Sequence, residues 1–351
     1  MDGVMLRKLG STFALTLAAA TLPLSPAAAD NPNSVSLEAQ FDSMFGTELR
    51  APQSFEAVYD SPFERQLASL ADGSNGRIGV YAIDLTTGHE VGVLADQRFP
   101  LASTSKVAIA ATFLAGVDEG RWSLSSEFEL PGRGTYISAR EHLDLMITRS
   151  CNDCTDALLN AVGGPRAVNA WMRQTAGIYD FELTRDIASL VREDGRIDPA
   201  TQIDFNDSAT PRAMGRLLAG IYQGEWLSPY SRHVLMTAMG NTVTGKARMT
   251  SALPSSANLA HKTGTLSRTA SDIGIFTTPD GRTVAAAIYV TGQSRSMAIE
   301  NGSRSEKLAA RRNRDERIAS ITGALYRGFG QQPRPVDGRV WASADYNVGG
   351  Q

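Results

Sequence analysis

The chain has 351 residues, of which 42% are hydrophobic and 20% charged, so it is long and apolar enough to bury the core of one large α/β domain or of two lobes. The formal net charge is only −3, and the most basic stretch, around Arg311, is mixed with acidic residues, so nucleic acid is excluded as an expected partner. Two cysteines are too few for a disulfide scaffold and cannot alone close a tetrahedral zinc site, so we expect neither a metal nor another cofactor.

Residues 1–29 are typical of an export signal. A basic start at Arg7 and Lys8 precedes the apolar run Phe13–Leu24, and the small residues 27–29 offer a cleavage site. The alternative is a membrane anchor, but the run is shorter than the roughly 20 apolar residues that a spanning helix needs, and a proline interrupts it. We therefore expect a periplasmic or secreted protein that makes no stable membrane insertion after cleavage.

The remainder of the chain divides into three predicted parts. Residues 30–60 mix Asn, Pro, Ser and Gln with scattered apolar residues, which indicates an N-terminal extension. Residues 61–329 carry the periodic patterns of a folded domain. Residues 330–351 are predicted to form a loosely structured C-terminal tail.

The folded domain is predicted to begin with a helix and a hairpin. Ser61 can cap the helix, Pro62 suits its first position, and Glu64 completes a capping box. Arg77–Leu85 is rich in β-branched and aromatic residues, and after a Thr-Thr-Gly turn Glu90–Leu94 can return as the second arm.

The spacing of hydrophobic residues predicts helices through the middle of the chain and strands near its end. Ile273–Thr278 and Thr283–Val290 flank Pro279-Asp280-Gly281, which favours a second hairpin. Strands at both ends of a helical middle predict one sheet with the helical insertion as a second lobe, and a groove between lobes is a natural ligand site. The expected helices are 106–117, 138–146, 154–162, 211–222 and 305–326.

Ser103-Thr104-Ser105-Lys106 lies where an apolar approach turns into a helix. Serine and lysine three residues apart on a first helical turn face the same way. A hydroxyl needs a base to remove its proton, and a lysine desolvated beside apolar or cationic groups can be that base. The amide of Ser103, near a helix N-terminus, could also stabilise an oxyanion. Taken alone, Ser-x-x-Lys is common, and a pair of surface residues is the simpler interpretation.

Two further segments carry polar groups of the same kind. Ser150-Cys151-Asn152 projects a hydroxyl and an amide from a short connection between helices, although an ordinary helix cap explains it equally well. His261-Lys262-Thr263-Gly264-Thr265 precedes the strand from Ile273, and its glycine would let a substrate backbone lie close along a sheet edge. A simple turn would use the same residues.

The cysteines Cys151 and Cys154 have three interpretations. They can pair with each other, stay buried as thiols, or form a Cys-x-x-Cys redox centre. A redox centre usually begins a helix that follows a strand, whereas the pattern here is helical on both sides. The redox interpretation is therefore disfavoured.

Together and in this order, the three motifs resemble the active site of class A β-lactamases and related penicillin-binding proteins. The similarity runs from about Ser61 to Phe329 and includes Phe99-Pro100 and Gly163-Gly164-Pro165. The resemblance implies an α/β (α+β) fold of the β-lactamase/transpeptidase type, in which an antiparallel sheet flanked by helices joins an all-helical lobe. Residues 61–329 would then be the catalytic domain.

The resemblance also implies a role for each matching residue. Ser103 would be the acylated nucleophile, Lys106 its base, Ser150 a proton shuttle, and Asn152 a donor to the substrate amide. These four residues come from the first two motifs.

The third motif would bind the charged end of the substrate. Lys262, Thr263 and Thr265 would hold the substrate carboxylate beside Gly264. The oxyanion hole would come from the backbone amides of Ser103 and Thr265, aimed at charge that develops only in the tetrahedral state.

The sequence departs from the family pattern in two places. Cys151 stands where class A enzymes usually carry Asp, and we hypothesise that it pairs with Cys154. The segment from Thr184 to Asp207 resembles the loop where these enzymes keep Glu-x-x-Leu-Asn, but no such motif is present. Glu193 is the nearest candidate for the water-activating base, although a solvated loop charge is the simpler interpretation.

Two lesser expectations follow from the same departures. Asp186 and Asp194 are weaker candidates for the base. The arginine that often completes the carboxylate pocket is not on the strand after Lys262, and Arg268 or Arg314 is expected to substitute for it.

The predicted function is therefore a monomeric serine hydrolase of class A β-lactamase type, which is acylated at Ser103 by β-lactams and hydrolyses their amide bond without a cofactor. A D-alanyl-D-alanine peptidase acting on peptidoglycan stem peptides is the alternative that the missing glutamate favours. A non-catalytic cell-wall-binding module is the third interpretation, and it predicts no covalent adduct.

Overall fold

The computed structural model describes residues 61–71 and 75–331, which lie in the second of the two units, Tyr59–Gln351, into which the chain divides. The predicted export signal over 1–29, the predicted extension over 30–60 and the chain from residue 332 onward lie outside the described residues. Within the described part, no helix combines the length and the apolar character needed to cross a membrane.

A five-stranded antiparallel sheet forms the centre of the unit, in the order β2-β1-β10-β9-β8. The first and last strands of the sequence meet in it, because β1 pairs with β10 with Ile78 opposite Val290. The edge strand β8 follows the helical lobe in the sequence and pairs with β9 in the sheet. The strands are β1 (Ile78–Asp84), β2 (Glu90–Val93), β8 (Ala260–Leu266), β9 (Thr269–Thr277) and β10 (Thr283–Thr291).

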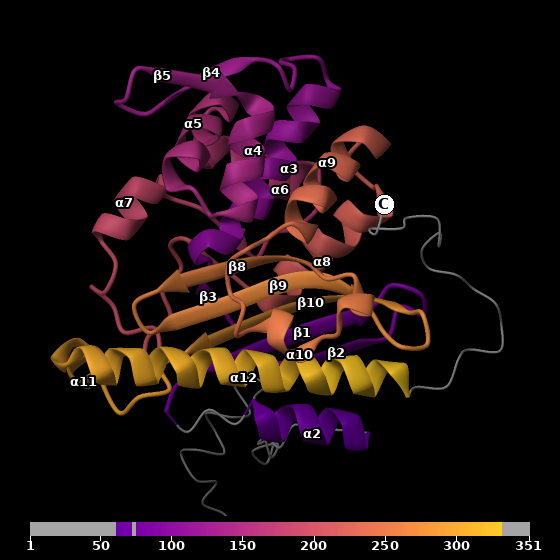
Figure 1. Ribbon diagram of the computed structural model, residues 1–351, viewed down its shortest axis with the longest axis vertical. Helices are drawn as coiled ribbons and strands as arrows, with labels where there is room; N and C mark the ends of the chain where they lie inside the picture. The colour runs from indigo at the N-terminus through magenta and orange to yellow at the C-terminus, as the bar shows by residue number, and fades with distance from the viewer. Residues whose placement is uncertain (1–60, 72–74, 332–351) are drawn as a thin grey trace, which may run out of the picture. The chain divides into compact units, whose positions relative to one another are not determined.

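Both faces of the sheet are covered, which explains why its central strands are apolar on both sides. Along β10, Val284, Ala286 and Ile288 join one core cluster, whereas Ala285 and Ala287 join the other. In Figure 1 the long helix α12 runs along one face with α2 beyond it. The helices on that face are α2 (Pro62–Leu70), α10 (Met249–Ala252) and α12 (Arg304–Gly330).

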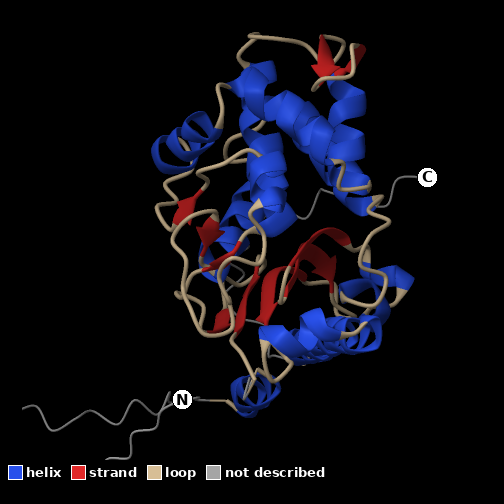
Figure 2. Ribbon diagram, turned by 90° about the vertical axis from the view of Figure 1, so that its left-hand side faces the viewer, coloured by secondary structure: helices blue, strands red, loops and turns tan. Residues whose placement is uncertain are grey.

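The opposite face carries α8 (Pro211–Gln223) and the helical lobe (Figure 2). The central helix of the lobe, α3 (Ser105–Asp118), is buried on all sides from Ser105 to Gly116, as expected of a helix without a polar face. The helices around it are α4 (Ala139–Thr148), α5 (Asn152–Val162), α6 (Pro165–Gln174) and α9 (Pro229–Gly240).

Smaller elements complete the unit. A three-stranded ribbon in the order β3-β7-β6 brings the two ends of the segment 183–207 together, so that segment forms a loop anchored at both ends. These smaller elements are β3 (Phe99–Pro100), η1 (Ala102–Thr104), β4 (Glu127–Leu130), β5 (Thr135–Ser138), β6 (Phe181–Glu182), α7 (Ile187–Arg192), β7 (Ser208–Ala209), η2 (Ser255–Ala257) and α11 (Met297–Gly302).

The antiparallel sheet with a mainly helical lobe confirms the predicted fold class, although the lobe also carries the β4–β5 hairpin. The capping box at Ser61 is present in full, whereas at Ser138 the described contacts include only the half in which the hydroxyl accepts from Glu141 N. Two boundaries were wrong. β9 begins at Thr269 rather than Ile273, and the last helix, α12, ends at Gly330 rather than at residue 326.

Candidate active site

The nucleophile candidate Ser103 lies in the 3-10 turn η1, at the entrance to α3. Ala102 before it has a φ of 46°, a left-handed conformation that L-residues rarely adopt. Two contacts of Thr104 stabilise the turn, since its Oγ1 donates to Leu101 O at 2.5 Å and lies 3.0 Å from the Tyr289 hydroxyl. Ser103 itself is half-buried, and its hydroxyl makes no hydrogen bond to any described residue.

The amine of Lys106 is fully buried and surrounded by neutral oxygens. Its Nζ donates to Asn152 Oδ1 and to Ser150 O, both at 2.7 Å, and lies 3.2 Å from Ser150 Oγ. Burial, aided by the positive charge of Lys262, lowers the pKa of Lys106 to about 6. An amine with this pKa is uncharged at neutral pH and can accept a proton.

Ser150 connects the two buried lysines of the site. Its hydroxyl lies 3.2 Å from Lys106 Nζ and 3.0 Å from Lys262 Nζ. Burial is the main cause that lowers the pKa of Lys262 to about 7; nearby Arg248 lowers it further, and the charge of Asp272 opposes the shift. The arrangement can carry a proton along the line Lys106, Ser150, Lys262.

A cavity of about 280 Å³ lies where these groups meet. Its lining comes from both lobes, with the nucleophile turn and the α4–α5 connection on one side and β8 on the other. Of the predicted site residues, this cavity brings together Ser103, Ser150, Asn152, Thr263 and Thr265, and Lys106 and Lys262 reach it through Ser150. The lining residues are Ser103, Ser150, Asn152, Thr244, Gly245, Arg248, Thr263 and Thr265.

Lys262, Thr263, Gly264 and Thr265 are part of β8 itself, not of a turn before the sheet. The structure gives a different reason for Gly264 than close approach of a substrate. A Cβ atom there would lie 2.4 Å from Ser271 Oγ and 3.0 Å from Ala102 Cβ. The glycine therefore lets the edge strand pack directly against the turn that carries Ser103.

Arg248 was not predicted, yet it is the cation that lines the cavity beside β8. Its guanidinium donates to Gly264 O at 2.8 Å and to Thr265 Oγ1 at 2.8 Å, and pairs with Asp315 at 2.6 Å. Thr244, also not predicted, lies 2.6 Å from Thr263 by their hydroxyls. Neither residue belongs to a recognisable motif, so no local signal in the sequence pointed to them.

The two arginines expected to complete the carboxylate pocket lie elsewhere. Arg268 pairs with Asp198 at 2.8 Å and Glu300 at 3.0 Å, and Arg314 pairs with Glu300 at 2.8 Å. All three of Arg268, Arg314 and Glu300 are buried. They are part of a buried ion-pair cluster at α11, whereas Arg248 lines the Ser103 cavity.

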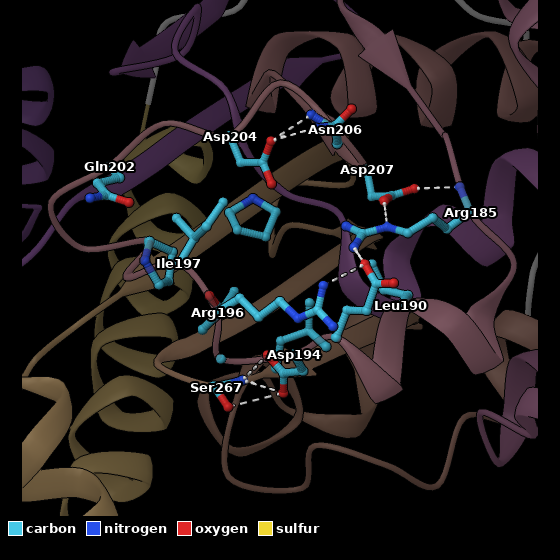
Figure 3. Close-up of a pocket in the computed structure, with 16 residues that line it drawn as sticks. Arg185, Leu190, Asp194, Arg196, Ile197, Gln202, Asp204, Asn206, Asp207 and Ser267 are labelled. Atoms are coloured by element: carbon cyan, nitrogen blue, oxygen red, sulfur yellow. Dashed lines mark hydrogen bonds and ion pairs between the residues drawn. The ribbon is translucent and has the colours of Figure 1, made fainter.

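Glu193, the nearest candidate for the water-activating base, is not among the residues that line the Ser103 cavity. The Glu193 carboxylate pairs with Arg185 at 2.6 Å, and Arg185 also pairs with Asp207 at 2.6 Å. Figure 3 shows Arg185 and Asp207 at a second cavity, of about 270 Å³, which is formed mainly by the segment 185–207 and which Glu193 also lines. The ion pair with Arg185 keeps Glu193 in that cavity and out of the lining of the Ser103 cavity.

The lesser candidates for a base are also engaged away from Ser103. Asp186 caps α7 by accepting from Ser189 N at 2.6 Å. Asp194 accepts from the backbone N of Ser267 at 2.9 Å and from its hydroxyl at 3.0 Å. That contact joins the loop to the β8–β9 turn (Figure 3).

One carboxylate acts on the catalytic lysine although the sequence did not single it out. Asp156 is buried on α5, one turn after Asn152, and its charge raises the pKa of Lys106 against the effect of burial. It accepts from Ile187 N at 2.7 Å and Ala188 N at 3.0 Å, so it also fixes the start of α7. The i,i+4 spacing from Asn152 was the signal that could have revealed it.

Cys151 and Cys154 are joined by a disulfide with a Cα–Cα distance of 5.4 Å. The bridge spans the first turn of α5, and its first cysteine, Cys151, stands between Ser150 and Asn152 in the sequence. Among residues 61–71 and 75–331, no group of His, Cys, Asp and Glu side chains is arranged to hold a metal ion.

Comparison with known proteins gives the same assignment from several directions. The profile of the β-lactamase enzyme family matches residues 62–328. An imipenem-hydrolysing β-lactamase from Enterobacter cloacae is 28% identical over 254 residues, which are 67% of this chain and 84% of that protein. A β-lactamase from Streptomyces albus G is 28% identical over 262 residues, or 69% and 80% of the two chains.

Solved structures of the same class superpose on the described unit. The class A β-lactamase of the last common ancestor of Gram-negative bacteria gives a TM-score of 0.65 at 30% identity, covering 77% of this chain and 100% of that one. A β-lactamase from Chitinophaga pinensis gives 0.65 at 25% identity, with 77% and 100% covered. With the profile spanning most of its length, this chain belongs to the β-lactamase enzyme family.

Proposed function

We propose that the protein is a class A type serine β-lactamase that uses Ser103 as nucleophile and Lys106 as base. The observation that carries the proposal is the position of the Ser150 hydroxyl, 3.2 Å from one buried amine and 3.0 Å from another, at a cavity that Ser103 lines. The relatives named as β-lactamases supply the substrate class. Export to the periplasm or medium and action as a monomer belong to the same proposal.

Acylation begins with proton transfer from Ser103 to the uncharged amine of Lys106. The Ser103 oxygen bonds to the lactam carbonyl carbon, and the lactam C–N bond then breaks as Ser150 donates a proton to the departing nitrogen. Ser150 recovers a proton from the lysines that flank it. The nucleophile and its base are expected to approach each other more closely once substrate fills the cavity.

Charge that develops on the lactam oxygen is stabilised by the backbone amides of Ser103 and Thr265 in this proposal, and loss of one such donor typically costs about 10²-fold or more in rate. The substrate carboxylate lies against Lys262, Thr263 and Thr265. Arg248 adds a second fixed positive charge, because Thr265 Oγ1 is bonded to its guanidinium. Asn152 orients the acyl amide.

Deacylation is the step for which this site differs from the family pattern. Among the described residues no carboxylate lines the Ser103 cavity, and Glu193 is paired with Arg185 in another one. We infer that Lys106, once it has passed on its proton, also activates the hydrolytic water. Release of the acyl group is then expected to be slower than its formation.

The test is intact-mass measurement over time after addition of a penicillin, together with turnover of a chromogenic cephalosporin. We expect a Ser103 adduct that forms and then decays with release of the opened lactam, and Ser103→Ala should abolish both signals. A stable adduct without turnover would instead identify a D-alanyl-D-alanine peptidase of slow deacylation. No adduct at all would identify a non-catalytic cell-wall-binding module, and either outcome would contradict the proposal.

A further inference from the structure

The disulfide lies inside the catalytic machinery rather than beside it. Cys151 is flanked by Ser150 and Asn152, and both of those side chains contact the amine of Lys106. Cys151 O lies 3.4 Å from the same amine. Cys154 is only 1% exposed and belongs to the core of the helical lobe, so the bridge ties this connection to a rigid element.

The Cys151–Cys154 bridge lies at the N-terminus of α5, where other helices of the chain have a side chain that caps the helix through a hydrogen bond. Ser138, Thr210 and Ser228 each accept from a backbone N–H in the first turn of their helix through a side-chain oxygen. At α5 the cap residue is Cys151, whose sulfur lies 3.1 Å from Cys154 N. Sulfur is a weak acceptor, so the covalent bond does at this helix what an oxygen does at the others.

The residue just before the bridge has an unfavourable backbone. Ser150 has a φ of 58°, in the left-handed region. Such a conformation persists when the surroundings over-determine it. Here Cys151 N donates to Leu145 O at 3.1 Å, and Cys151 O accepts from Thr155 Oγ1 at 2.7 Å. These bonds hold one side of the connection, and the disulfide holds the other.

We propose that the Cys151–Cys154 disulfide is a positioning device, which keeps Ser150 and Asn152 in the conformation that lets them contact the catalytic lysine. The inference rests on the proposed function, since it concerns acylation of Ser103. Reduction by a dithiol breaks the S–S bond and leaves two thiols, while the dithiol is oxidised to its own disulfide. Only the weak sulfur cap and the hydrogen bonds of the Cys151 backbone to Leu145 and Thr155 then hold the connection that carries Ser150.

The experiment compares three proteins. The first is the wild type before and after dithiothreitol, with thiols counted under denaturing, non-reducing conditions. The second is C151A/C154A, which has neither bridge nor cap. The third is C151D/C154A, which lacks the bridge but restores an oxygen cap to the same backbone N–H. The chain has only two cysteines, so both variants are blind to the reductant and control for its other effects.

Two readouts are taken on each protein. One is the rate constant for Ser103 acylation by a penicillin in a single turnover. The other is hydrogen exchange of the amides in residues 149–155, which does not depend on activity. We expect C151A/C154A and the reduced wild type to acylate about 10²-fold more slowly, the loss typical of a small misplacement of catalytic groups. We also expect faster exchange confined to that segment, and recovery of most of the rate in C151D/C154A.

Several results would overturn the inference. Two free thiols in the untreated protein would show that the bridge does not form. An unchanged acylation rate in C151A/C154A would show that the bridge has no effect on acylation. Faster exchange throughout the lobe, without recovery in C151D/C154A, would assign the bridge to general stability. Wild type that forms no adduct would refute the proposed function instead, and the exchange data would still report whether the bridge holds this segment.

Discussion

The first wall to compare is the α4–α5 connection, which lines the Ser103 cavity, and the second is the segment 184–207, which lines the other cavity; the two are built in different ways. The connection that carries Ser150 and Asn152 is closed by a disulfide and touches buried amines through neutral oxygens. The segment 184–207 is instead held by ion pairs centred on Arg185, and it presents Val191 and Phe205 to solvent, 51% and 68% exposed. The first wall therefore positions the groups that we propose to transfer the proton, whereas the second holds its carboxylates outside the Ser103 cavity.

The largest effect is expected at Lys106, whose amine contacts the first wall. Lys106→Met removes the base but keeps an apolar, unbranched side chain in the buried position. Because a general base typically contributes about 10²–10⁴-fold, we expect Ser103 acylation to slow by roughly 10³-fold with little change in thermal stability. Single-turnover mass spectrometry measures the rate. Near-normal acylation in this variant would show that another group removes the Ser103 proton.

The second wall is expected to respond in stability. Asp207 is buried and accepts from Thr184 N at 2.8 Å and from Arg185 N at 3.1 Å, besides its ion pair with Arg185. Asp207→Ala leaves those donors unsatisfied, and breaking a buried pair costs about 3 kcal/mol or more. Urea unfolding should show this loss.

Its matched control is Asp194→Ala, which removes the exposed contact to Ser267 on the same segment. We expect a change within about 0.5 kcal/mol there, as for most surface substitutions. Equal losses at Asp207 and Asp194 would contradict the view that one buried ion pair anchors the segment.

The two lysines set the expected pH dependence of kcat/KM. Activity should rise as Lys106 loses its proton near pH 6, and fall as Lys262 loses its own near pH 7, because the substrate carboxylate needs a positive charge. Lys262→Arg keeps that charge at all neutral pH values, so the descending limb should vanish. At one pH unit above the limb this is worth about tenfold. A descending limb that persists would assign it to another group.

The smallest effect is expected at Asp156. Its negative charge raises the pKa of Lys106, so Asp156→Asn should lower that pKa and move the ascending limb toward lower pH by a fraction of a unit. The shift is limited because burial, rather than the charge of Asp156, is the largest influence on the pKa of Lys106. A pH profile of kcat/KM measures it, and movement toward higher pH would contradict the assigned interaction.

The parts of the site that could be predicted from sequence are those carried by short spacings. Ser103 and Lys106 are three residues apart at the junction of η1 and α3, and Ser61 and Glu64 are three residues apart in a capping box. The local backbone sets both relations. The start of β9 was wrong for the opposite reason. Ser271 and Asp272 are polar yet buried, since Ser271 O accepts from Arg248 and Asp272 bonds to His261. Only tertiary contacts could make such residues part of a strand.

The same reasoning explains Arg248 and Glu193. Arg248 reaches the cavity because its guanidinium is held by carbonyls of two strands and by Asp315, partners that are far away in sequence. Glu193 is directed elsewhere by Arg185, eight residues before it, across a loop whose path the sequence pattern does not specify. The sequence suggested Glu193 and missed Arg248, and in both cases the ion-pair and hydrogen-bond partners decide where the charge lies.

The contact at Gly264 links the two lobes mechanically. A Cβ atom at this position would be 3.2 Å from Leu101 O and 3.0 Å from Ala102 Cβ, so the edge strand and the nucleophile turn have no free space between them. Thr263 and Thr265, which we propose to bind the substrate carboxylate, flank Gly264 on this strand. A shift of the strand toward the turn would meet Ala102, the residue next to Ser103, so the two proposed halves of the site keep a fixed spacing.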